Sequence, residues 1–466
     1  MSPEATLALG GALHEQVRAH LFPGDGLEGA AILVCTRTPG PRVRLLARDA
    51  ILIPYGECVR RQAAITWPGD YIEQAIDKGD AEQLALILIH SHPGGLFAFS
   101  DVDDASDSQV IPSLFQAYGD LHGSAIMTDN GAIRARLYAP NFTQRPVDLV
   151  TVAGHDLSYW WEADARLSGP SRRPMAFTGA MTAQLGRLTA VVIGVSGTGS
   201  IVAEQLARLG FNRVILIDFD EVEGRNLNRI LNAKLSDAES RRLKVAMFAE
   251  AIASYRGDGV AGPVAASVLT REAVLAASQA DVIFSCVDTL EARQIADLIA
   301  AAFLIPLLDV GVVIPVRKAG EDLAIADVCG RIDYVQPGGS TLRDRGVYSP
   351  NSLRAEYLRR SAPEAHQQEL EAGYIKGLIE EAPAVISLNM RAASACVNEF
   401  VARAFPYRQE PNRLYARTQF SLAACDEDFS SEAAFPAAAN PMLGRGALEP
   451  LLGLPALAPI IDGDLQ

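Results

Sequence analysis

The sequence predicts an α/β protein of two domains, in which an α/β sandwich is followed by a doubly wound parallel sheet. Three observations predict this fold class. The chain has 466 residues, too many for a single hydrophobic core. Strand-like and helix-like segments are mixed through the first 148 residues. From residue 189 a strand, a glycine turn, a helix and a second strand follow within about 30 residues, the order of a βαβ unit.

The predicted domains have boundaries at changes of composition. We expect a first domain over 1–148, and in it we expect the following elements: helices at 12–22 and 108–120, and strands at 29–37, 43–55, 84–90, 123–129 and 132–140. The segment 149–183 contains "SGPSRRP" and is predicted to be a linker. We expect a second domain over 184–410, with further strands in 280–288 and 305–314. A tail over 411–466, rich in Ala, Pro and Leu, shows no clear structure.

Composition and charge exclude several classes of protein. The formal net charge is -15, whereas a phosphate backbone selects basic surfaces, so no nucleic-acid partner is expected. The six cysteines form no C-x-x-C pair, which argues against a disulfide framework. We find no signal peptide and no apolar run of about 18 residues, so we expect a cytoplasmic protein with no membrane partner.

A histidine pair ends the apolar strand in "LILIHSHPGGLFAFSDVDD". His90 and His92 are two positions apart, a spacing that directs both imidazoles to one side of an extended chain. Asp103 follows closely enough to return a carboxylate to the same place. Two histidines and one carboxylate form an open zinc site that keeps a position for water. Zinc lowers the pKa of that water and generates a nucleophile at neutral pH.

Such a site also needs a base and an oxyanion donor. Ser100 offers a hydroxyl donor. The base must be a glutamate from elsewhere in the chain, and Glu28, just before the strand 29–37, is a better candidate than Glu57 in "YGECV". We interpret the remaining aspartates of the stretch as turn and N-cap residues of the following helix: Asp101, Asp104 and Asp107.

The spacing H-x-H-P-(six)-S-x-x-D resembles the JAMM signature of MPN-type metalloproteases, the JAB/Mov34 family. Members are zinc isopeptidases that cleave after the C-terminal glycine of ubiquitin-like proteins. The resemblance implies a JAMM sandwich domain with His90, His92 and Asp103 as zinc ligands. It also implies Glu28 as the catalytic base and Ser100 as the oxyanion donor.

The glycine turn "IGVSGTGS" carries Gly194, Gly197 and Gly199 between a strand and a helix. Main-chain N–H groups at such a turn bind phosphates, helped by the helix dipole. The dinucleotide pattern G-x-G-x-x-G would place a glycine at 196, where Ser196 stands, so an ordinary oxidoreductase is disfavoured.

Charged residues follow the next strands. Asp218 in "LIDFDEVEGRNLNR" lies where a carboxylate binds ribose hydroxyls. Asn226, Arg229 and Lys244 are groups that would surround a triphosphate. Asp288 ends "ADVIFSCVD", where it could hold magnesium.

These segments together resemble the ThiF/MoeB family of ATP-dependent enzymes that activate ubiquitin-like proteins, over about residues 172–405. The resemblance implies a Rossmann-like adenylation domain that binds ATP and magnesium and forms homodimers. Asp218 would bind ribose, and Asn226, Arg229 and the catalytic Lys244 would contact phosphates beside the three glycines. Asp288 would coordinate magnesium. A catalytic arginine supplied by the partner subunit would match Arg172, or else Arg173.

The sequence departs from that family in its cysteines. No cysteine follows the "PG" of "VQPGGSTLRDRG", so no structural zinc is expected there, and 340–378 has no candidate catalytic cysteine. Cys329 is the nearest thiol. A hydroxyl nucleophile would instead come from Ser340, Thr341 or Tyr374. Because a hydroxyl without a base is a weak nucleophile, we favour direct transfer of the acyl-adenylate to another protein.

Both halves point to one substrate class, a protein that ends in glycine. We expect a two-headed enzyme of a bacterial ubiquitin-like pathway, with a ubiquitin-like protein and a conjugating-enzyme-like protein as partners. One head would adenylate the modifier, and the other would process or deconjugate it. Two alternatives are sulfur-carrier activation for cofactor or amino-acid biosynthesis, and a binding scaffold with one inactive head.

Overall fold

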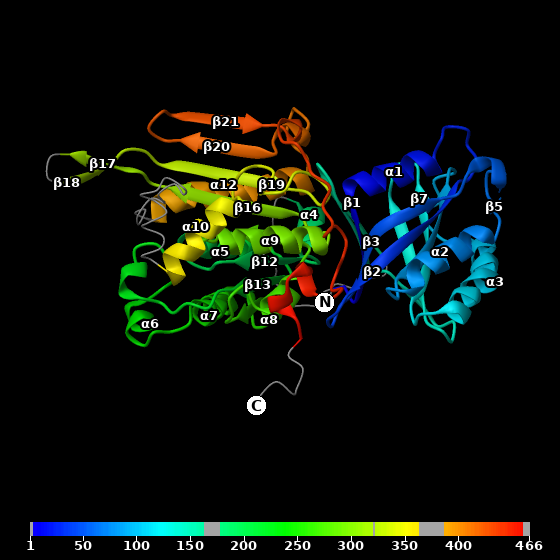
Figure 1. Cartoon of the computed structure of the whole chain (residues 1–466), viewed down its shortest axis with the longest axis horizontal. Coiled ribbons are helices and arrows are strands. Elements are labelled where there is room, and N and C mark those ends of the chain that lie inside the picture. Colours follow the sequence, from blue (N-terminus) through cyan, green and yellow to red (C-terminus); the bar gives the residue numbers. More distant parts are fainter. Residues whose placement is uncertain (1–2, 163–177, 320–321, 363–385, 460–466) are drawn as a thin grey trace. The chain divides into compact units, whose positions relative to one another are not determined.

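The computed structural model describes residues 3–162, 178–319, 322–362 and 386–459 (Figure 1). These residues divide into two compact units. The first unit contains 3–162 together with 301–304 and the C-terminal stretch 440–459. The second unit contains the described residues of 178–300 and 305–439.

The first unit is built on a nine-stranded mixed sheet with the order β11-β10-β1-β3-β2-β6-β7-β8-β9. Its strands are β1 (Ala5–Gly10), β2 (Ala30–Thr38), β3 (Val43–Leu52), β6 (Ala85–His92), β7 (His122–Thr128), β8 (Ile133–Tyr138), β9 (Gln144–Pro146), β10 (Leu149–Ala153) and β11 (Leu157–Trp161). A separate small hairpin joins β4 (Val59–Arg60) to β5 (Ile65–Thr66). Its helices are α1 (Gly11–Leu21), α2 (Asp70–Asp80) and α3 (Asp101–Ala117).

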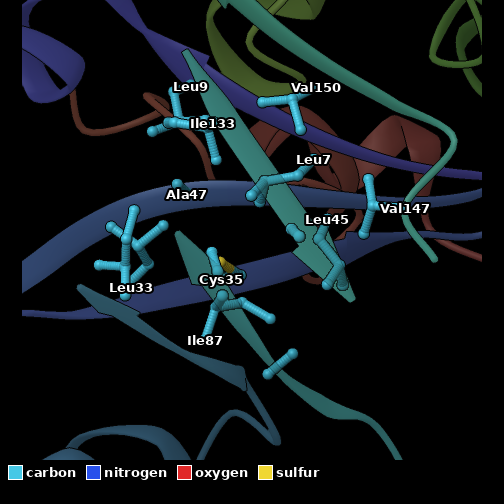
Figure 2. Close-up of a cluster of buried hydrophobic side chains, with 14 of the residues drawn as sticks. Leu7, Leu9, Leu33, Cys35, Leu45, Ala47, Ile87, Ile133, Val147 and Val150 are labelled. Atoms are coloured by element: carbon cyan, nitrogen blue, oxygen red, sulfur yellow. The ribbon is translucent and has the colours of Figure 1, made fainter. Parts of the chain in front are cut away.

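Helices cover both faces of this sheet. On β2 the odd-numbered Leu33 and Cys35 join the cluster that contains Val17 of α1, shown in part in Figure 2. The even-numbered Ile32 on the same strand joins a second cluster, with Ile111 of α3. Successive side chains of a strand point to opposite faces, so the apolar run 30–35 of β2 is explained by burial on both sides. The predicted α/β sandwich is confirmed.

The boundaries of the first unit differ from those expected. The predicted end at 148 is too early, because β10 pairs with β1 and β11 pairs with β10, and both lie inside the predicted linker. The stretch 440–459 was assigned to a tail without clear structure but belongs to this unit. There the Thr36 hydroxyl donates to the carbonyl of Gly444 at 2.6 Å.

The second unit is built on an eight-stranded sheet with the order β14-β13-β12-β15-β16-β19-β20-β21. Its strands are β12 (Thr189–Ile193), β13 (Arg213–Ile217), β14 (Ala261–Val264), β15 (Val282–Ser285), β16 (Leu307–Val313), β19 (Cys329–Val335), β20 (Arg417–Ser421) and β21 (Asp426–Ser430), with a separate hairpin of β17 (Val316–Ala319) and β18 (Asp322–Ile325). Its helices are α4 (Gly179–Leu185), α5 (Gly197–Leu209), α6 (Leu235–Glu239), α7 (Lys244–Arg256), α8 (Arg271–Ala277), α9 (Leu290–Ala302), α10 (Pro350–Ser361) and α12 (Ile386–Ala404).

The first five strands of this sheet, β14 to β16, are parallel. The chain moves outward from β12 through β13 to β14, and then returns to the other side of β12 with β15. Ligands bind beyond the carboxyl ends of the strands at such a reversal. The predicted βαβ unit is confirmed as β12, α5 and β13, and the predicted Rossmann-like fold is present.

Three antiparallel strands extend this sheet beyond β16. Two of them, β20 and β21, lie after residue 410, where the second domain was expected to end. The expected boundary is therefore too early, because these strands complete the sheet. Among the described helices, none is both long enough and apolar enough to cross a membrane. Arg172, Arg173 and Tyr374 lie outside the described residues.

Candidate functional site

Strand register brings Glu28, His90 and His92 together in the first unit. β2 and β6 are antiparallel, with Ala30 opposite His90, so Glu28 just before β2 lies near the carboxyl end of β6. The even-numbered residues of both strands point to the face that α2 and α3 cover. The ligand atoms of Glu28, His90 and His92 all lie within 4.8 Å of one another. The Nε2 atoms of the two histidines are 3.1 Å apart.

Helix α3 adds Asp103 to this cluster. Its Oδ1 lies 2.9 Å from Nε2 of His90, and its Oδ2 lies 3.4 Å from Nε2 of His92. Ser100 is the N-cap of α3 and forms a capping box with Asp103. The main-chain N–H and the hydroxyl of Ser100 donate to Asp103 Oδ2 at 2.6 and 2.8 Å. The spacing of three residues in the sequence motif is thus also the spacing of a helix cap.

This donor set fits zinc. Two imidazole nitrogens and a carboxylate are preferred zinc ligands, and a tetrahedral ion with bonds of about 2.0 Å separates its ligands by about 3.3 Å. The distances from His90 Nε2 to His92 and to Asp103 are 3.1 and 2.9 Å, close to that separation. Nδ1 of His92 lies 2.8 Å from the carbonyl of Leu96, an arrangement that leaves Nε2 for a metal.

Burial and the neighbouring charges shift the pKa values of this site. Burial raises the pKa of Glu28, and the two histidines oppose that shift. Burial also acts to raise the pKa of Asp103, but hydrogen bonds from His90 and His92 outweigh it and hold the pKa well below its usual range. A glutamate with a raised pKa is suited to accept a proton near neutral pH. Glu57, the weaker candidate, is exposed in the short helix Tyr55–Glu57 and is not in the cluster.

The expectation that Asp107 is a turn or cap residue is wrong. Its carboxylate is buried and accepts hydrogen bonds from Arg136 at 2.6 Å, from the Tyr138 hydroxyl at 2.8 Å, and from Ser124. Asp107 lies one helical turn beyond Asp103, so α3 presents it to β7 and β8. The resulting ion pair ties α3, and with it Asp103, to the sheet.

In the second unit, the glycine turn between β12 and α5 leaves no room for side chains. Gly194 has φ +85°, and a Cβ there would lie 2.9 Å from the carbonyl oxygen of Cys286. A Cβ on Gly199 would lie 1.7 Å from the carbonyl oxygen of Gly194, and one on Gly197 would lie 2.4 Å from Asn389 Nδ2. The three glycines are therefore required by close approach of neighbouring groups, and they keep main-chain N–H groups uncovered at the start of α5.

Asp218 and Lys244 lie at the carboxyl end of β13 and the start of α7. The Asp218 carboxylate accepts main-chain hydrogen bonds from Val195 at 2.7 Å and from Asp220 at 2.9 Å. Burial raises the pKa of Asp218, and Lys244 opposes the shift. Nζ of Lys244 donates to Asp220 Oδ2 at 2.6 Å. Asp218 is thus held against the glycine turn, and each carboxylate oxygen can accept a further hydrogen bond.

The other predicted phosphate contacts lie in and after the short helix Gly224–Asn226. Oδ1 of Asn226 accepts from the main-chain N–H of Glu223 at 3.1 Å. Arg229 approaches the glycine turn, because its Cδ would be 3.2 Å from a Cβ on Gly197. Asp288 is exposed between β15 and α9, at the reversal of the sheet. Asn389 of α12, also beside Gly197, was missed, because no sequence motif links it to that turn.

Three candidate nucleophiles of the second unit lie among the described residues: Cys329, Ser340 and Thr341. Partial burial, together with Asp327, raises the pKa of the Cys329 thiol. The buried Ser340 hydroxyl donates to Glu432 at 2.7 Å and accepts from Arg345 Nε at 2.9 Å. The Thr341 hydroxyl donates to the carboxylate of Asp344 at 2.9 Å. Cys329 is therefore weakly ionised at neutral pH, and Ser340 is closed to solvent.

The fold and the two sites define a class of protein, an α/β chain that joins a histidine–carboxylate cluster to a glycine-turn site on a doubly wound sheet. Residues 11–137 match the family of prokaryotic homologs of the JAB domain, and residues 171–390 match the ThiF family. The chain is an N-terminal JAB-domain homologue fused to a ThiF-family domain.

Similar proteins match parts of the chain. Ubiquitin-like modifier-activating enzyme 5 of Caenorhabditis briggsae is 30% identical over 164 residues, which are 32% of this chain and 34% of that protein. The tRNA threonylcarbamoyladenosine dehydratase of Bacillus subtilis (strain 168) is 52% identical over 48 residues, which are 10% of this chain and 19% of that protein. The chain thus spans about a third of the length of the first relative.

Solved structures of E. coli MccB also resemble the chain. The structure with ATP has a TM-score of 0.42 and 15% sequence identity, covering 56% of this chain and 68% of that chain. The structure with succinimide has a TM-score of 0.41 and 16% identity, covering 54% and 66% respectively.

Proposed function

We propose that this protein is a two-headed enzyme of a cytoplasmic, bacterial ubiquitin-like pathway. The second unit adenylates the C-terminal glycine of a ubiquitin-like protein with ATP and magnesium, and the first unit is a zinc-dependent isopeptidase for the same modifier. The observation that carries the proposal is the presence of both donor sets in one chain. The cluster of Glu28, His90, His92 and Asp103 lies in the part that matches the JAB-domain homologues, and the turn that follows β12 lies in the part that matches the ThiF family. We infer that both sites act on the same C-terminal glycine.

In the first unit, His90, His92 and Asp103 would hold the zinc ion. When bound, zinc polarises the scissile carbonyl and lowers the pKa of water. Glu28, beside the histidines, accepts the proton of the attacking water and passes it to the leaving amine. The Ser100 hydroxyl donates to the developing oxyanion, for which it must release its hydrogen bond to Asp103.

In the second unit, the triphosphate lies against the N-terminus of α5. Asp218 accepts the ribose hydroxyls, and Asn226, Arg229 and Lys244 contact phosphates. A carboxylate oxygen of the modifier's terminal glycine attacks the α-phosphorus, and pyrophosphate leaves. The positive charges offset the repulsion between the two anions. Asp288 would hold magnesium, and Arg172 of the partner subunit in a homodimer completes the site.

A nucleophile on another protein, such as a conjugating-enzyme-like protein, attacks the acyl carbon of the adenylate directly. The acyl group is transferred to that protein and AMP leaves. The raised pKa of Cys329 supports this route, because a protonated thiol is a poor nucleophile. The burial of the Ser340 hydroxyl also supports it, because an acyl group cannot reach a side chain that is closed to solvent.

Incubation with a small β-grasp protein that ends in glycine, ATP and magnesium tests the proposal, with intact mass as the readout. We expect an adenylate from the second unit, and from a precursor with extra residues we expect a trimmed C-terminus. Asp288→Ala should abolish the adenylate only. Loss of both products in that variant would contradict two separate sites. A thiocarboxylate product in the presence of a sulfur donor would support sulfur-carrier activation instead.

A further inference from the structure

Arg60 makes an extensive set of hydrogen bonds beside the candidate zinc site. Its side chain is only 8% exposed. Nε donates to the carbonyl of Glu28 at 2.7 Å, and Nη2 donates to the carbonyl of Leu27 at 3.0 Å. The guanidinium also binds the Asp25 carboxylate through two nitrogens, at 2.6 and 3.1 Å. One side chain thus holds three points of the segment 25–28.

The Arg60 side chain is itself held in place by aromatic rings. Its guanidinium carbon lies 4.4 Å from the centroid of the Tyr55 ring, within the range of a cation–π contact. On Tyr55 the His20 ring is stacked at 4.9 Å, and the Tyr55 hydroxyl donates to the His20 carbonyl at 2.6 Å. Arg60 is therefore a rigid support for the 25–28 segment.

Main-chain contacts continue this support to the histidines. The N–H of Glu28 donates to the carbonyl of Arg61 at 2.9 Å. The N–H of Gly29 donates to the hydroxyl of Ser91 at 2.8 Å, and the N–H of Ser91 donates to the carbonyl of Gly29 at 3.0 Å. Ser91 lies between His90 and His92. Glu28 is thus fixed from both sides, by residues 60–61 and by the strand that carries the histidines.

We propose that Arg60 is a positioning residue that sets the place of Glu28 beside His90 and His92. Its contacts go to the main chain of Glu28 and to Asp25, whose charge compensates its own. Arg60 therefore acts through the geometry of Glu28. A general base that is displaced by about 1 Å loses much of its effect. The activity tests of this inference rest on the proposed hydrolase function.

The neighbouring loop allows substrate binding to be separated from positioning. A hollow of about 230 Å³ lies beside the site, and Arg60 bonds two of its lining residues, Asp25 and Leu27. A residue that only shaped this hollow would change KM. A residue that positions Glu28 should change kcat.

The activity test uses a ubiquitin-like protein joined through its C-terminal glycine to a fluorescent amine, with zinc present. For Arg60→Ala we expect kcat to fall by about 10- to 100-fold, the range seen when groups that orient a metal site are removed, with bound zinc unchanged. A change in KM alone, with kcat kept, would overturn the proposal. Arg60→Lys should recover part of the loss, because the ammonium keeps the charge and can donate to some of the same acceptors. Arg48→Ala is the matched control, since Arg48 makes an exposed ion pair with Glu82 in the same unit.

A double variant separates positioning from general stability. If Arg60 acts through Glu28, Arg60→Ala should have no further effect on kcat in a Glu28→Gln background. An additive loss in the double variant would overturn the proposal.

Hydrogen exchange of the zinc-free protein gives a readout that does not depend on activity. In Arg60→Ala, amides 27–29 should exchange about 10- to 100-fold faster, whereas those of 86–90 should not change. Unchanged exchange at 27–29 would overturn the proposal even if the protein hydrolyses nothing. If the wild type is inactive on all substrates but exchange at 27–29 accelerates as expected, the proposed function fails while the support of Glu28 by Arg60 stands.

Discussion

The two units reach their candidate sites by different routes. In the first unit, Glu28, His90 and His92 meet because they stand at alternate positions on, or just before, two paired strands. In the second unit, the glycine turn can form because Gly194 and Gly199 have no side chains. A Cβ at either position would lie too close to a main-chain carbonyl oxygen. The first site is thus damaged by the loss of a donor atom. The second site is damaged when a substitution adds a Cβ atom to one of these glycines.

The largest effect should come from adding a Cβ atom to the glycine turn of the second unit. Gly199→Ala places a Cβ 1.7 Å from the carbonyl oxygen of Gly194, so the turn must shift. We expect ATP–pyrophosphate exchange to fall at least about 100-fold, as when a main-chain donor of an anion site is lost, with peptidase activity kept. Gly179→Ala is the control, because a Cβ there meets nothing within 4 Å. If Gly199→Ala kept full ATP–pyrophosphate exchange, the assignment of the glycine turn to the ATP site would be wrong.

The next largest effect should come from removing a proposed zinc ligand from the first unit. His90→Ala deletes one of three proposed ligands, and we expect loss of bound zinc and a fall in hydrolysis of more than about 100-fold. ATP–pyrophosphate exchange by the second unit should not change. Elemental analysis and the two activity assays check this, with His14→Ala as the control, since His14 bonds the carbonyl of Gly131 instead. Wild-type zinc content in His90→Ala would refute the ligand assignment.

The buried ion pair behind the first site should dominate that unit's stability. Asp107→Ala leaves Arg136, whose side chain is 4% exposed, without its buried partner. We expect a loss of about 3–5 kcal/mol in the free energy of unfolding, measured with urea. Asp120→Ala breaks an exposed pair with Arg37 and should cost less than about 1 kcal/mol. Equal losses in the two variants would show that burial does not matter here.

A smaller loss should follow at the cap of α3. Ser100→Ala removes the acceptor for the main-chain N–H of Asp103 and should destabilise the first unit by about 1 kcal/mol. Ser100→Thr should restore both the cap and hydrolysis. Urea unfolding and the peptidase assay measure the two effects. Full hydrolysis by Ser100→Ala would remove Ser100 from the oxyanion role.

The smallest effect should come from the thiol of the second unit. Because the pKa of Cys329 is raised, little thiolate forms at neutral pH, and Cys329→Ser should leave adenylation and transfer unchanged. Intact mass before and after hydroxylamine is the measurement. A hydroxylamine-sensitive adduct that disappears in Cys329→Ser would establish a thioester and contradict direct transfer.

Local patterns in the sequence predicted much of the fold and of both sites. The alternation that ends in His90 and His92 is a property of any strand, so their common direction needed no structure. The spacing from Ser100 to Asp103 is likewise local. The glycines after β12 are readable because only glycine tolerates such close approach. That Glu28 lies beside the two histidines could be predicted only from the family resemblance, because Glu28 and His90 are 62 positions apart in the sequence.

Other features depend on contacts that no local pattern encodes. Asp107 has the sequence appearance of a cap, but in α3 it is buried against Arg136 of strand β8. The strands β20 and β21 are short and largely polar. They are strands because β20 pairs with the edge of β19, and β21 pairs in turn with β20. Asn389 meets Gly197 across almost two hundred residues.

The sequence by itself determined the order of the two domains, the faces of their strands and the residue types of each site, because side-chain periodicity and glycine geometry are local. Only the tertiary structure decided where the units end, which charges are buried, and that Arg60 supports Glu28. Those outcomes depend on which distant segments pair, and on hydrogen bonds to main-chain carbonyls that every residue possesses.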